Sequence, residues 1–354
     1  MELQAILKRT LDLGGSDIFI VPGSPVMAKV RGRLVEVSDG RVMPDDTEDL
    51  IRQTYALARG RDIAQLIENG DDDFSFSLER LCRFRCNAYR QRGTLAAAYR
   101  VVAFGLPDYK SLEIPELVME LTQNRAGMIL VTGPAGSGKS TTLACMVDRI
   151  NTTRQGHIIT IEDPIEYLHA HRMSLVSQRE VPSDAPSFAR ALRGALRQAP
   201  DVVMLGEMRD SETVQTAITA AETGHLLLSS LHTVGAAKTI DRIIDAFPPN
   251  QQHQVRVQLS MVLRAVVSQR LIPTLDGSQV PVFEVMTVNS AIQNMIRDGK
   301  TYQIDNAIYG GTAGQSMISM DGELLRLCRD KRITRDTALL YAVNPDALRK
   351  RLPM

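Results

Sequence analysis

The sequence predicts an α/β protein with two domains, an α+β domain at the N-terminus and a larger domain built on a mostly parallel sheet. Residues 1–104 show short strand patterns joined by tight-turn residues, with helices between them. Over residues 105–116 the pattern loosens around Gly105, Pro107 and Pro115, which is typical of a linker between domains. In residues 117–354 helices alternate with apolar strands, as in a parallel sheet that is covered on both faces.

The N-terminal domain is expected to combine two hairpins with helices. Gly14–Asp17 ends the first helix, and Asp45 and Asp46 begin another where the helix dipole favours acidic side chains. Arg31-Gly32 and Gln91-Arg92-Gly93 supply the hairpin turns. In order, we expect a helix over residues 1–13, strands over 18–21, 26–30 and 33–37, helices over 44–57 and 62–68, and strands over 72–78, 83–90 and 95–102.

The larger domain is expected to alternate strands and helices up to residue 230 and to be chiefly helical after about residue 270. Its expected strands are Met128–Thr132, His157–Ile161, Val202–Gly206 and His225–Ser230. Its expected helices are residues 140–151, Ser187–Gln198, Glu212–Glu222, Ser290–Asp298, Gly322–Asp330, Arg335–Ala342 and Pro345–Leu352.

The composition excludes several classes of protein. Acidic and basic residues balance at 41 each, so no overall charge attracts nucleic acid or a membrane surface. No run of about 18 apolar residues could span a bilayer. The first residues, Met1–Asp12, form an amphipathic pattern without the apolar core of a signal peptide. We therefore expect a cytoplasmic protein that reaches a membrane only through a partner.

The four cysteines form no Cys-x-x-Cys pair. Cys82 and Cys86 would share one face of a strand, but a metal site needs more ligands than this pair offers. We expect these two, Cys145 and Cys328 to be reduced and mostly packed thiols.

A phosphate-binding loop is the most specific motif in the chain. Gly133-Pro134-Ala135-Gly136-Ser137-Gly138-Lys139-Ser140 fits G-x-x-x-x-G-K-[ST] at every fixed position. An apolar strand precedes it and a helix that includes Thr141 follows it, which is the context the motif requires. Backbone amides at the helix N-terminus can hold phosphate, Lys139 can reach the β- and γ-phosphates, and Ser140 can offer its hydroxyl to magnesium. The loop predicts binding of ATP or GTP.

Two apolar strands downstream of the loop end in acidic residues. Residues 202–206 run into Glu207, in the form of a Walker B strand with glutamate where many proteins carry aspartate. Residues 158–161 run into Glu162 and Asp163, and Pro164 ends that strand. A single such acid would more often be a helix cap or a solvated turn. Two of them beside a phosphate loop favour a metal-side acid and a group that positions water.

Histidines and arginines provide further candidates. His225 and His232 flank one apolar strand at an odd separation, so a shared metal site is disfavoured. His232 ranks higher as a phosphate sensor, because open α/β sheets bind ligands at the carboxyl ends of their strands. Arginines that could stabilise charge lie on two predicted hairpin strands and around the second acidic strand; they are Arg85, Arg100, Arg193, Arg197 and Arg209, although each taken singly is more often a surface charge.

Four motifs, in this order, resemble those of the secretion-superfamily ATPases. Residues 133–140, 161–166, 201–210 and 223–233 correspond to the motifs called Walker A, Asp box, Walker B and His box. Three further segments, residues 14–18, 237–248 and 291–297, extend the likeness over essentially the whole chain. The last two of these look like the type IV pilus retraction ATPases of the PilT and PilU types.

The resemblance implies a PAS-like N-terminal domain, a RecA-like ATPase domain and a homo-hexameric ring that hydrolyses ATP with Mg²⁺. Glu162 would act as the general base or position the attacking water, and Glu207 would support magnesium. Arg85 and Arg100 would close on the phosphates, and His232 matches the second histidine of its motif. Such a motor drives pilus retraction and twitching motility, with an inner-membrane platform protein, and in some cases a paralogous retraction ATPase, as partner.

Two departures from the pattern leave the PilT and PilU types open. Gln198-Ala199-Pro200 stands where PilT-type proteins carry an acidic pair, and Gln293 replaces an arginine of the usual Ala-Ile-Arg. The chain lacks the long N-terminal domain and four-cysteine insert of extension and type II secretion relatives, which favours retraction. One alternative is a secretion or conjugation ATPase. Another is a nucleotide-sensing regulator that binds without turnover, against which the presence of Glu162 and Glu207 argues. A third is a nucleic-acid translocase, which the zero net charge and the absence of a basic tract disfavour.

Overall fold

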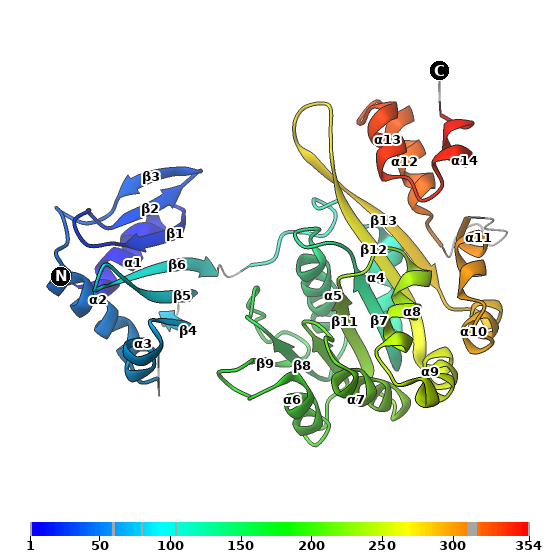
Figure 1. Cartoon of the computed structure of the whole chain (residues 1–354), viewed down its shortest axis with the longest axis horizontal. Helices are drawn as coiled ribbons and strands as arrows, with labels where there is room; N and C mark the ends of the chain where they lie inside the picture. Colours follow the sequence, from blue (N-terminus) through cyan, green and yellow to red (C-terminus); the bar gives the residue numbers. More distant parts are fainter. Residues whose placement is uncertain (1, 59–60, 79–80, 103–104, 310–316, 353–354) are drawn as a thin grey trace. The chain divides into compact units, whose positions relative to one another are not determined.

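The computed structural model describes residues 2–58, 61–78, 81–102, 105–309 and 317–352 (Figure 1). Met1, where the first helix was expected to begin, and residue 104, the expected limit of the first domain, lie outside these residues. The chain forms two compact units: an N-terminal unit of Met1–Gly105 with Glu166–Leu168, and a C-terminal unit of Leu106–Ile165 with His169–Met354. The expected fold class, an α+β unit followed by a sheet-based ATPase unit, is confirmed.

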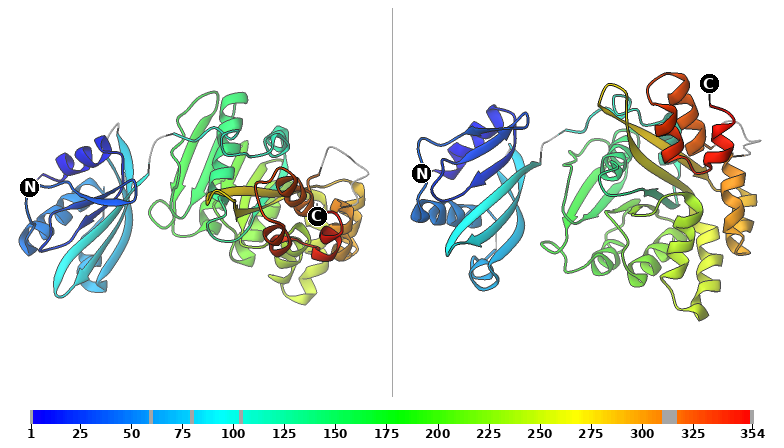
Figure 2. Two further views of the ribbon diagram at one scale, coloured as in Figure 1. Left: turned by 90° about the horizontal axis from the view of Figure 1, so that it is seen from above. Right: turned by 45° about the horizontal axis from the view of Figure 1, so that its top comes forward.

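The N-terminal unit is a six-stranded antiparallel sheet in the order β3-β2-β1-β6-β5-β4. Helices cover one of its faces (Figure 2). Alternate strand residues such as Ile18 and Ile20 pack against Leu7 and Leu50 of these helices in one apolar core. Its elements are α1 (Leu3–Asp12), β1 (Gly15–Ile20), β2 (Met27–Val30), β3 (Arg33–Glu36), α2 (Pro44–Leu57), α3 (Ala64–Asn69), β4 (Asp71–Leu78), β5 (Cys82–Gln91) and β6 (Thr94–Val102).

Both predicted hairpins are present, and their turns explain why they form. Gln91 pairs with Thr94 across Arg92 and Gly93, whose φ angles are 47° and 78°. The turn at Arg31 and Gly32 repeats this geometry, with φ angles of 48° and 79°. Two successive left-handed residues give a turn whose twist matches that of the strands it joins. The first strand begins earlier than predicted, because β1 starts at Gly15 and only two residues separate it from α1.

The C-terminal unit is a seven-stranded sheet in the order β13-β12-β7-β11-β10-β8-β9. Every neighbouring pair is parallel except β12 and β13, which are antiparallel. Its strands are β7 (Gly127–Thr132), β8 (His157–Glu162), β9 (Leu175–Glu180), β10 (Val202–Leu205), β11 (Leu226–Leu231), β12 (Leu263–Pro273) and β13 (Gln279–Thr287).

Helices cover both faces of this sheet, which accounts for the nearly continuous apolar strands. In β7, Met128 and Leu130 face one apolar cluster, whereas Ile129 and Val131 face another. The first cluster includes residues of α6 (Phe188–Ala195), α7 (Ser211–Glu222), α8 (Ala236–Asp245) and α9 (Pro249–Val262). The second includes residues of α4 (Glu116–Glu120) and α5 (Lys139–Thr153).

The expectation of a chiefly helical chain after about residue 270 is wrong up to residue 287, because β12 runs to Pro273 and β13 spans Gln279–Thr287. It holds from Ser290 onward, where the structure has α10 (Ser290–Arg297), α11 (Ile304–Tyr309), α12 (Met320–Arg329), α13 (Arg335–Tyr341) and α14 (Pro345–Arg349). Helix α9 runs directly into β12 at Leu263 without an intervening glycine or proline, so the sequence carries no signal for the change.

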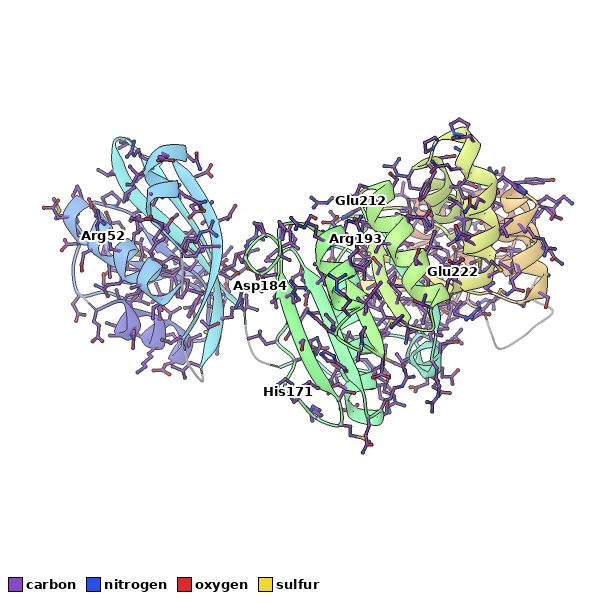
Figure 3. All side chains as sticks on the ribbon, turned by 90° about the horizontal axis from the view of Figure 1, so that it is seen from below. Arg52, His171, Asp184, Arg193, Glu212 and Glu222 are labelled. Carbon is purple, nitrogen blue, oxygen red and sulfur yellow. The ribbon has the colours of Figure 1, made fainter. Side chains whose placement is uncertain are left out.

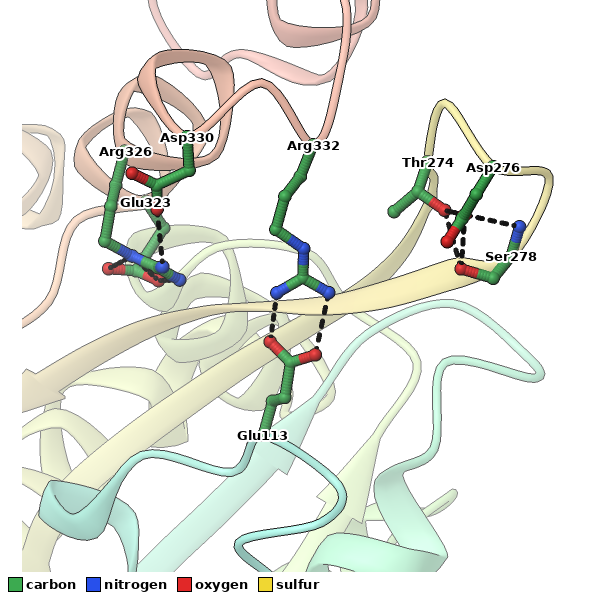
Figure 4. A network of polar contacts seen from close by, with 8 residues as sticks. All are labelled: Glu113, Thr274, Asp276, Ser278, Glu323, Arg326, Asp330 and Arg332. Atoms are coloured by element: carbon green, nitrogen blue, oxygen red, sulfur yellow. Dashed lines mark hydrogen bonds and ion pairs between the residues drawn. The ribbon is translucent and has the colours of Figure 1, made fainter.

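The C-terminal helices are tied to the segment that leads into the parallel sheet. Arg332, between α12 and α13, donates two hydrogen bonds of 2.5 and 2.7 Å to the carboxylate of Glu113 (Figure 4). The same view shows the tip of the β12–β13 hairpin, where Asp276 accepts hydrogen bonds from Thr274 and Ser278. These bonds lower the pKa of Asp276 to about 2 and stabilise the reversal between the strands.

Among the described residues, no helix combines the length and the apolar composition needed to cross a bilayer. All four cysteines are free thiols, and three of them are buried. Burial raises the pKa of Cys82 to about 11, so it stays protonated, as expected for a packed thiol.

Candidate nucleotide-binding site

The phosphate loop connects the carboxyl end of β7 with the N-terminus of α5. Gly133, Gly136 and Gly138 all have positive φ angles, of 150°, 74° and 88°. A Cβ atom at Gly133 would lie 2.2 Å from the backbone oxygen of Gln269 and 2.7 Å from the Ser137 hydroxyl oxygen. Glycine is therefore required at residue 133 by close packing as well as by backbone conformation.

Polar groups of the loop are held in its interior. The buried Lys139 Nζ donates to the backbone oxygens of Gly133 at 3.0 Å and Pro134 at 2.9 Å. Ser140 is exposed on the first turn of α5, and the neighbouring Thr141 is half-buried. The Ser137 hydroxyl oxygen is buried and has no hydrogen-bond partner among the described residues. The loop thus holds polar groups that can turn to an added anion.

These groups fit a nucleoside triphosphate with magnesium. The left-handed glycines free backbone N–H groups to face an anion, and Lys139 can exchange its carbonyl partners for phosphate oxygens. No cluster of three or more histidine, cysteine or acidic residues with metal-ligand geometry occurs in the described part of the chain. Magnesium would then take ligands from phosphate, Ser140 and Glu207, in keeping with its preference for few carboxylates plus phosphate oxygens.

A pocket of about 290 Å³ adjoins the loop at Gly138, Thr141 and Thr142. Gln269 of β12 fixes one wall, because its Oε1 accepts a hydrogen bond of 2.7 Å from the Thr142 hydroxyl. The rest of the lining is partly apolar, from Leu112, Ile114, Leu271 and Pro281, and partly polar, from Ser111, Glu113 and Gln279. Such a lining suits a flat heterocycle with a few polar edges. Gln269 was not predicted as a site residue, because β12 itself was not predicted.

Glu162 ends β8 with a side chain that is only 7% exposed. Its Oε1 accepts hydrogen bonds from the Thr160 hydroxyl at 2.6 Å and from Gln178 Nε2 at 3.2 Å. Gln178 lies beside Thr160 on β9, and its own Oε1 accepts from the His169 backbone N–H at 2.8 Å. The carboxylate therefore has a fixed orientation. Gln178 was not predicted as a site residue, because β9 itself was not predicted.

Glu207 follows β10, and the neighbouring parallel strand β8 ends at Glu162. Gly206, the residue before Glu207, donates its backbone N–H to the Ile161 oxygen at 2.8 Å. Arg209 Nη2 lies 2.5 Å from Glu207 Oε1, and His232 Nε2 lies 3.6 Å from Glu207 Oε2. The hydrogen bond to Glu207 raises the pKa of Arg209. These side chains and Arg242 line a pocket of about 300 Å³.

The two histidines lie at opposite ends of strand β11. His232 follows the carboxyl end of β11, on the edge that carries the phosphate loop. His225 precedes β11, and its Nδ1 lies 2.9 Å from the Ala220 oxygen and 3.1 Å from the Thr223 hydroxyl. The structure brings His232, Glu207 and Arg209 together and leaves His225 in a structural role.

Two predicted arginines of the C-terminal unit, Arg197 and Arg193, lie away from this group. Arg197 is exposed just after α6, beside Gln198, whose oxygen accepts from His157 at the amino end of β8. It is therefore at the edge opposite the phosphate loop. Arg193 pairs with Glu212 on the surface between α6 and α7 (Figure 3).

Arg85 and Arg100 belong to the N-terminal unit, where they line an open pocket of about 390 Å³ on the sheet face that the helices leave uncovered. Asp17 and Lys29 line it as well, and Arg100 Nε lies 3.0 Å from Asp17 Oδ1. The pocket is polar and exposed, as a surface that meets a charged ligand would be.

Comparisons with known proteins agree with this geometry. A family model described as Type II/IV secretion system protein matches residues 93–330. The Type IV pilus retractation ATPase PilT of Pseudomonas aeruginosa is 40% identical over 321 residues, which cover 90% of this chain and 92% of the relative. The Type IV pilus ATPase PilU of the same organism is 38% identical over 350 residues, covering 99% of this chain and 91% of the relative. A crystal structure of the pilus retraction motor PilT with bound ADP covers 99% of both chains, at 44% identity and a TM-score of 0.88.

Proposed function

The chain belongs to the family of type II/IV secretion system proteins, and from this we propose that it is an ATP-hydrolysing motor that drives retraction of type IV pili. The observation that carries the proposal is that the groups needed for hydrolysis all lie at the carboxyl end of the parallel sheet. The carboxyl ends of parallel strands in one sheet carry the glycine loop with Lys139, the oriented Glu162 and the paired Glu207. A protein that only bound nucleotide would have no need to hold Glu162 in one orientation.

The residues of the loop and of the neighbouring strand ends have separate roles in phosphoryl transfer to water. Loop amides and Lys139 bind the β- and γ-phosphates, and Glu162 orients the attacking water and accepts its proton. Glu207 and Ser140 would hold magnesium, which when bound neutralises charge on the phosphate oxygens. His232 and Arg209, both beside Glu207, respond to the charge at the γ-phosphate. The pocket at Gly138 and Gln269 receives the adenine and ribose.

The motor works as a ring of six copies in this proposal. Arg85 and Arg100 grip the phosphates when the N-terminal domain, residues 1–104, turns about the linker, residues 105–116. Arg197, exposed at the far edge of the sheet, is available to a neighbouring copy in the ring. The ring acts from the cytoplasm on an inner-membrane platform protein, and a paralogous retraction ATPase is a second partner.

The experiment that tests this function is imaging of pili in a strain that lacks the gene. We expect this strain to carry an excess of surface pili and to lack twitching motility. The wild-type gene should restore motility, and the Lys139→Ala gene should not. Normal pilus retraction together with a loss of protein secretion would instead assign the chain to a secretion or conjugation ATPase. Complementation of PilT-deficient and PilU-deficient strains would separate those two types.

A further inference from the structure

A buried polar cluster connects the β12–β13 hairpin with two loops at the carboxyl edge of the sheet. Ser268 and Glu284 are directly opposite one another on β12 and β13 and are 1% and 4% exposed. The Ser268 hydroxyl lies 2.8 Å from that of Thr132 and accepts a hydrogen bond of 3.1 Å from the Gly235 N–H. Glu284 Oε1 accepts one of 3.1 Å from the Ala236 N–H.

The hydrogen-bond partners of Ser268 and Glu284 lie where the phosphate loop begins and where the segment after His232 ends. Thr132 is the last residue of β7, directly before Gly133. Gly235 and Ala236 begin α8, only three residues after His232. Figure 1 shows α8 beside the long β12–β13 pair. The hairpin thereby fixes where the short segment 232–235 ends, and this segment carries the imidazole that faces Glu207.

An ionisable side chain at residue 284 is costly to bury, and a glutamine would accept the same hydrogen bond. Burial raises the pKa of Glu284 to about 7, and the Ala236 N–H at the start of α8 lowers it. Asp305 of α11 and Asp321 of α12 raise it further, whereas Arg270 of β12 lowers it. The carboxyl group therefore changes charge near neutral pH while it contacts the N-terminus of a helix, where negative charge is favoured.

We propose that Glu284 is a positioning residue for ATP hydrolysis, which in its ionised form holds the first turn of α8 and so keeps His232 beside Glu207. Protonation weakens this hold, and the segment 232–235 then samples positions away from Glu207. Turnover falls as the solution becomes acidic, while the phosphate loop still binds nucleotide. The inference rests on the proposed hydrolytic function of this site.

The test compares steady-state ATP turnover of wild type and Glu284→Gln between pH 6 and 8.5. In wild type, kcat should fall by about fivefold toward pH 6, because an ionised acceptor hydrogen bonds about twice as strongly as a neutral one. In Glu284→Gln, kcat should stay at the wild-type pH 6 level throughout, with KM for ATP unchanged. Glu284→Asp, which retains an ionisable group, should recover the dependence. Glu212→Gln, which removes one surface charge (Figure 3), should follow wild type.

The same experiment separates failure of the inference from failure of the function. Turnover by wild type at pH 8, absent in Lys139→Ala, establishes hydrolysis at this site. If Glu284→Gln then retains the wild-type pH profile, the positioning role is overturned while the function stands. If wild type shows no turnover at any pH, the proposed function fails and the inference fails with it. Circular dichroism of each variant checks that the fold persists.

Discussion

Arg85 and Arg100 lie directly opposite one another on the neighbouring antiparallel strands β5 and β6. Like charges at such a position destabilise a sheet. The Nε of Arg100 also contacts the carboxylate of Asp17. Burial raises the pKa of Asp17, but hydrogen bonds from Ser16 and Arg100 outweigh this and lower it. Two guanidinium groups held side by side at a cost in stability are suited to grip an anion in a forked geometry.

The first prediction concerns this pair. Replacing both Arg85 and Arg100 by lysine keeps the charge and removes the bidentate grip, so ATP turnover should fall. The free energy of unfolding should change by less than about 1 kcal/mol, because both side chains are exposed. Arg52→Lys, on helix α2 of the same unit (Figure 3), is the matched control and should leave turnover intact. Unchanged turnover in the double variant would reduce the pair to surface charge.

Lys139→Ala should abolish hydrolysis and weaken nucleotide binding. A hydrogen bond to a charged group contributes about 1.5–3 kcal/mol, so losing two phosphate contacts should weaken binding by about 10²-fold or more. Calorimetric titration with ATP and a phosphate-release assay measure the two effects. Full turnover in this variant would show that the glycine loop is not the site of hydrolysis.

Glu162→Ala should still bind ATP but hydrolyse it about 10²-fold to 10⁴-fold more slowly, the usual contribution of a general base. Glu162→Gln, which keeps the shape of the side chain, should be equally slow. Affinity and turnover are measured on the same preparation. A collapse of affinity, or turnover near that of wild type, would move the role to Glu207.

Gln178→Ala should lower kcat by about tenfold to 10²-fold, because the Glu162 carboxylate loses one of the hydrogen bonds that orient it. KM for ATP should not change, since Gln178 lies away from the phosphate loop on β9. The exposed His171, in the loop before β9 (Figure 3), offers a control in His171→Ala. Equal kcat values for the two variants would contradict a positioning role for Gln178.

Stability should depend on pH through Glu284. Its pKa is raised from 4.5 in the unfolded chain to about 7 in the folded protein, mainly by burial. The folded state then binds more protons between these values, so the free energy of unfolding falls as pH rises through this window. At about 1.4 kcal/mol per pKa unit, Glu284→Gln should be about 3 kcal/mol more stable than wild type at pH 8. Urea unfolding at pH 8 and pH 4 checks this, because the difference should vanish at the lower pH.

Local sequence signals were sufficient for much of the site. The glycine loop, Glu162, Glu207 and His232 each follow or precede an apolar strand, and the parallel sheet then brings them to one edge. The hairpin turns at Arg31-Gly32 and Arg92-Gly93 were equally clear, because few residue pairs accept two left-handed conformations.

What the sequence did not reveal depends on pairing between distant segments. Gln269, Ser268 and Glu284 reach the site only because β12 lies beside β7, and no local pattern encodes that parallel contact. The strand is further concealed by its uninterrupted junction with α9. Gln178 was missed for a related reason, because β9 is a short edge strand with weak alternation.

The packing of Gly133 against Gln269 has a consequence for how the protein folds while it is being synthesised. Strand β7 is buried on both faces, yet its neighbour β12 is made much later, with Thr132 and Ser268 separated by 136 positions. At a ribosomal rate of about 5–20 residues per second, the nascent chain waits roughly 7 to 27 seconds for that neighbour. Until β11 and then β12 are made, β7 has unpaired strand edges, which are apolar and are typical substrates of chaperones. The nucleotide pocket is completed only when the chain has left the ribosome as far as Pro281.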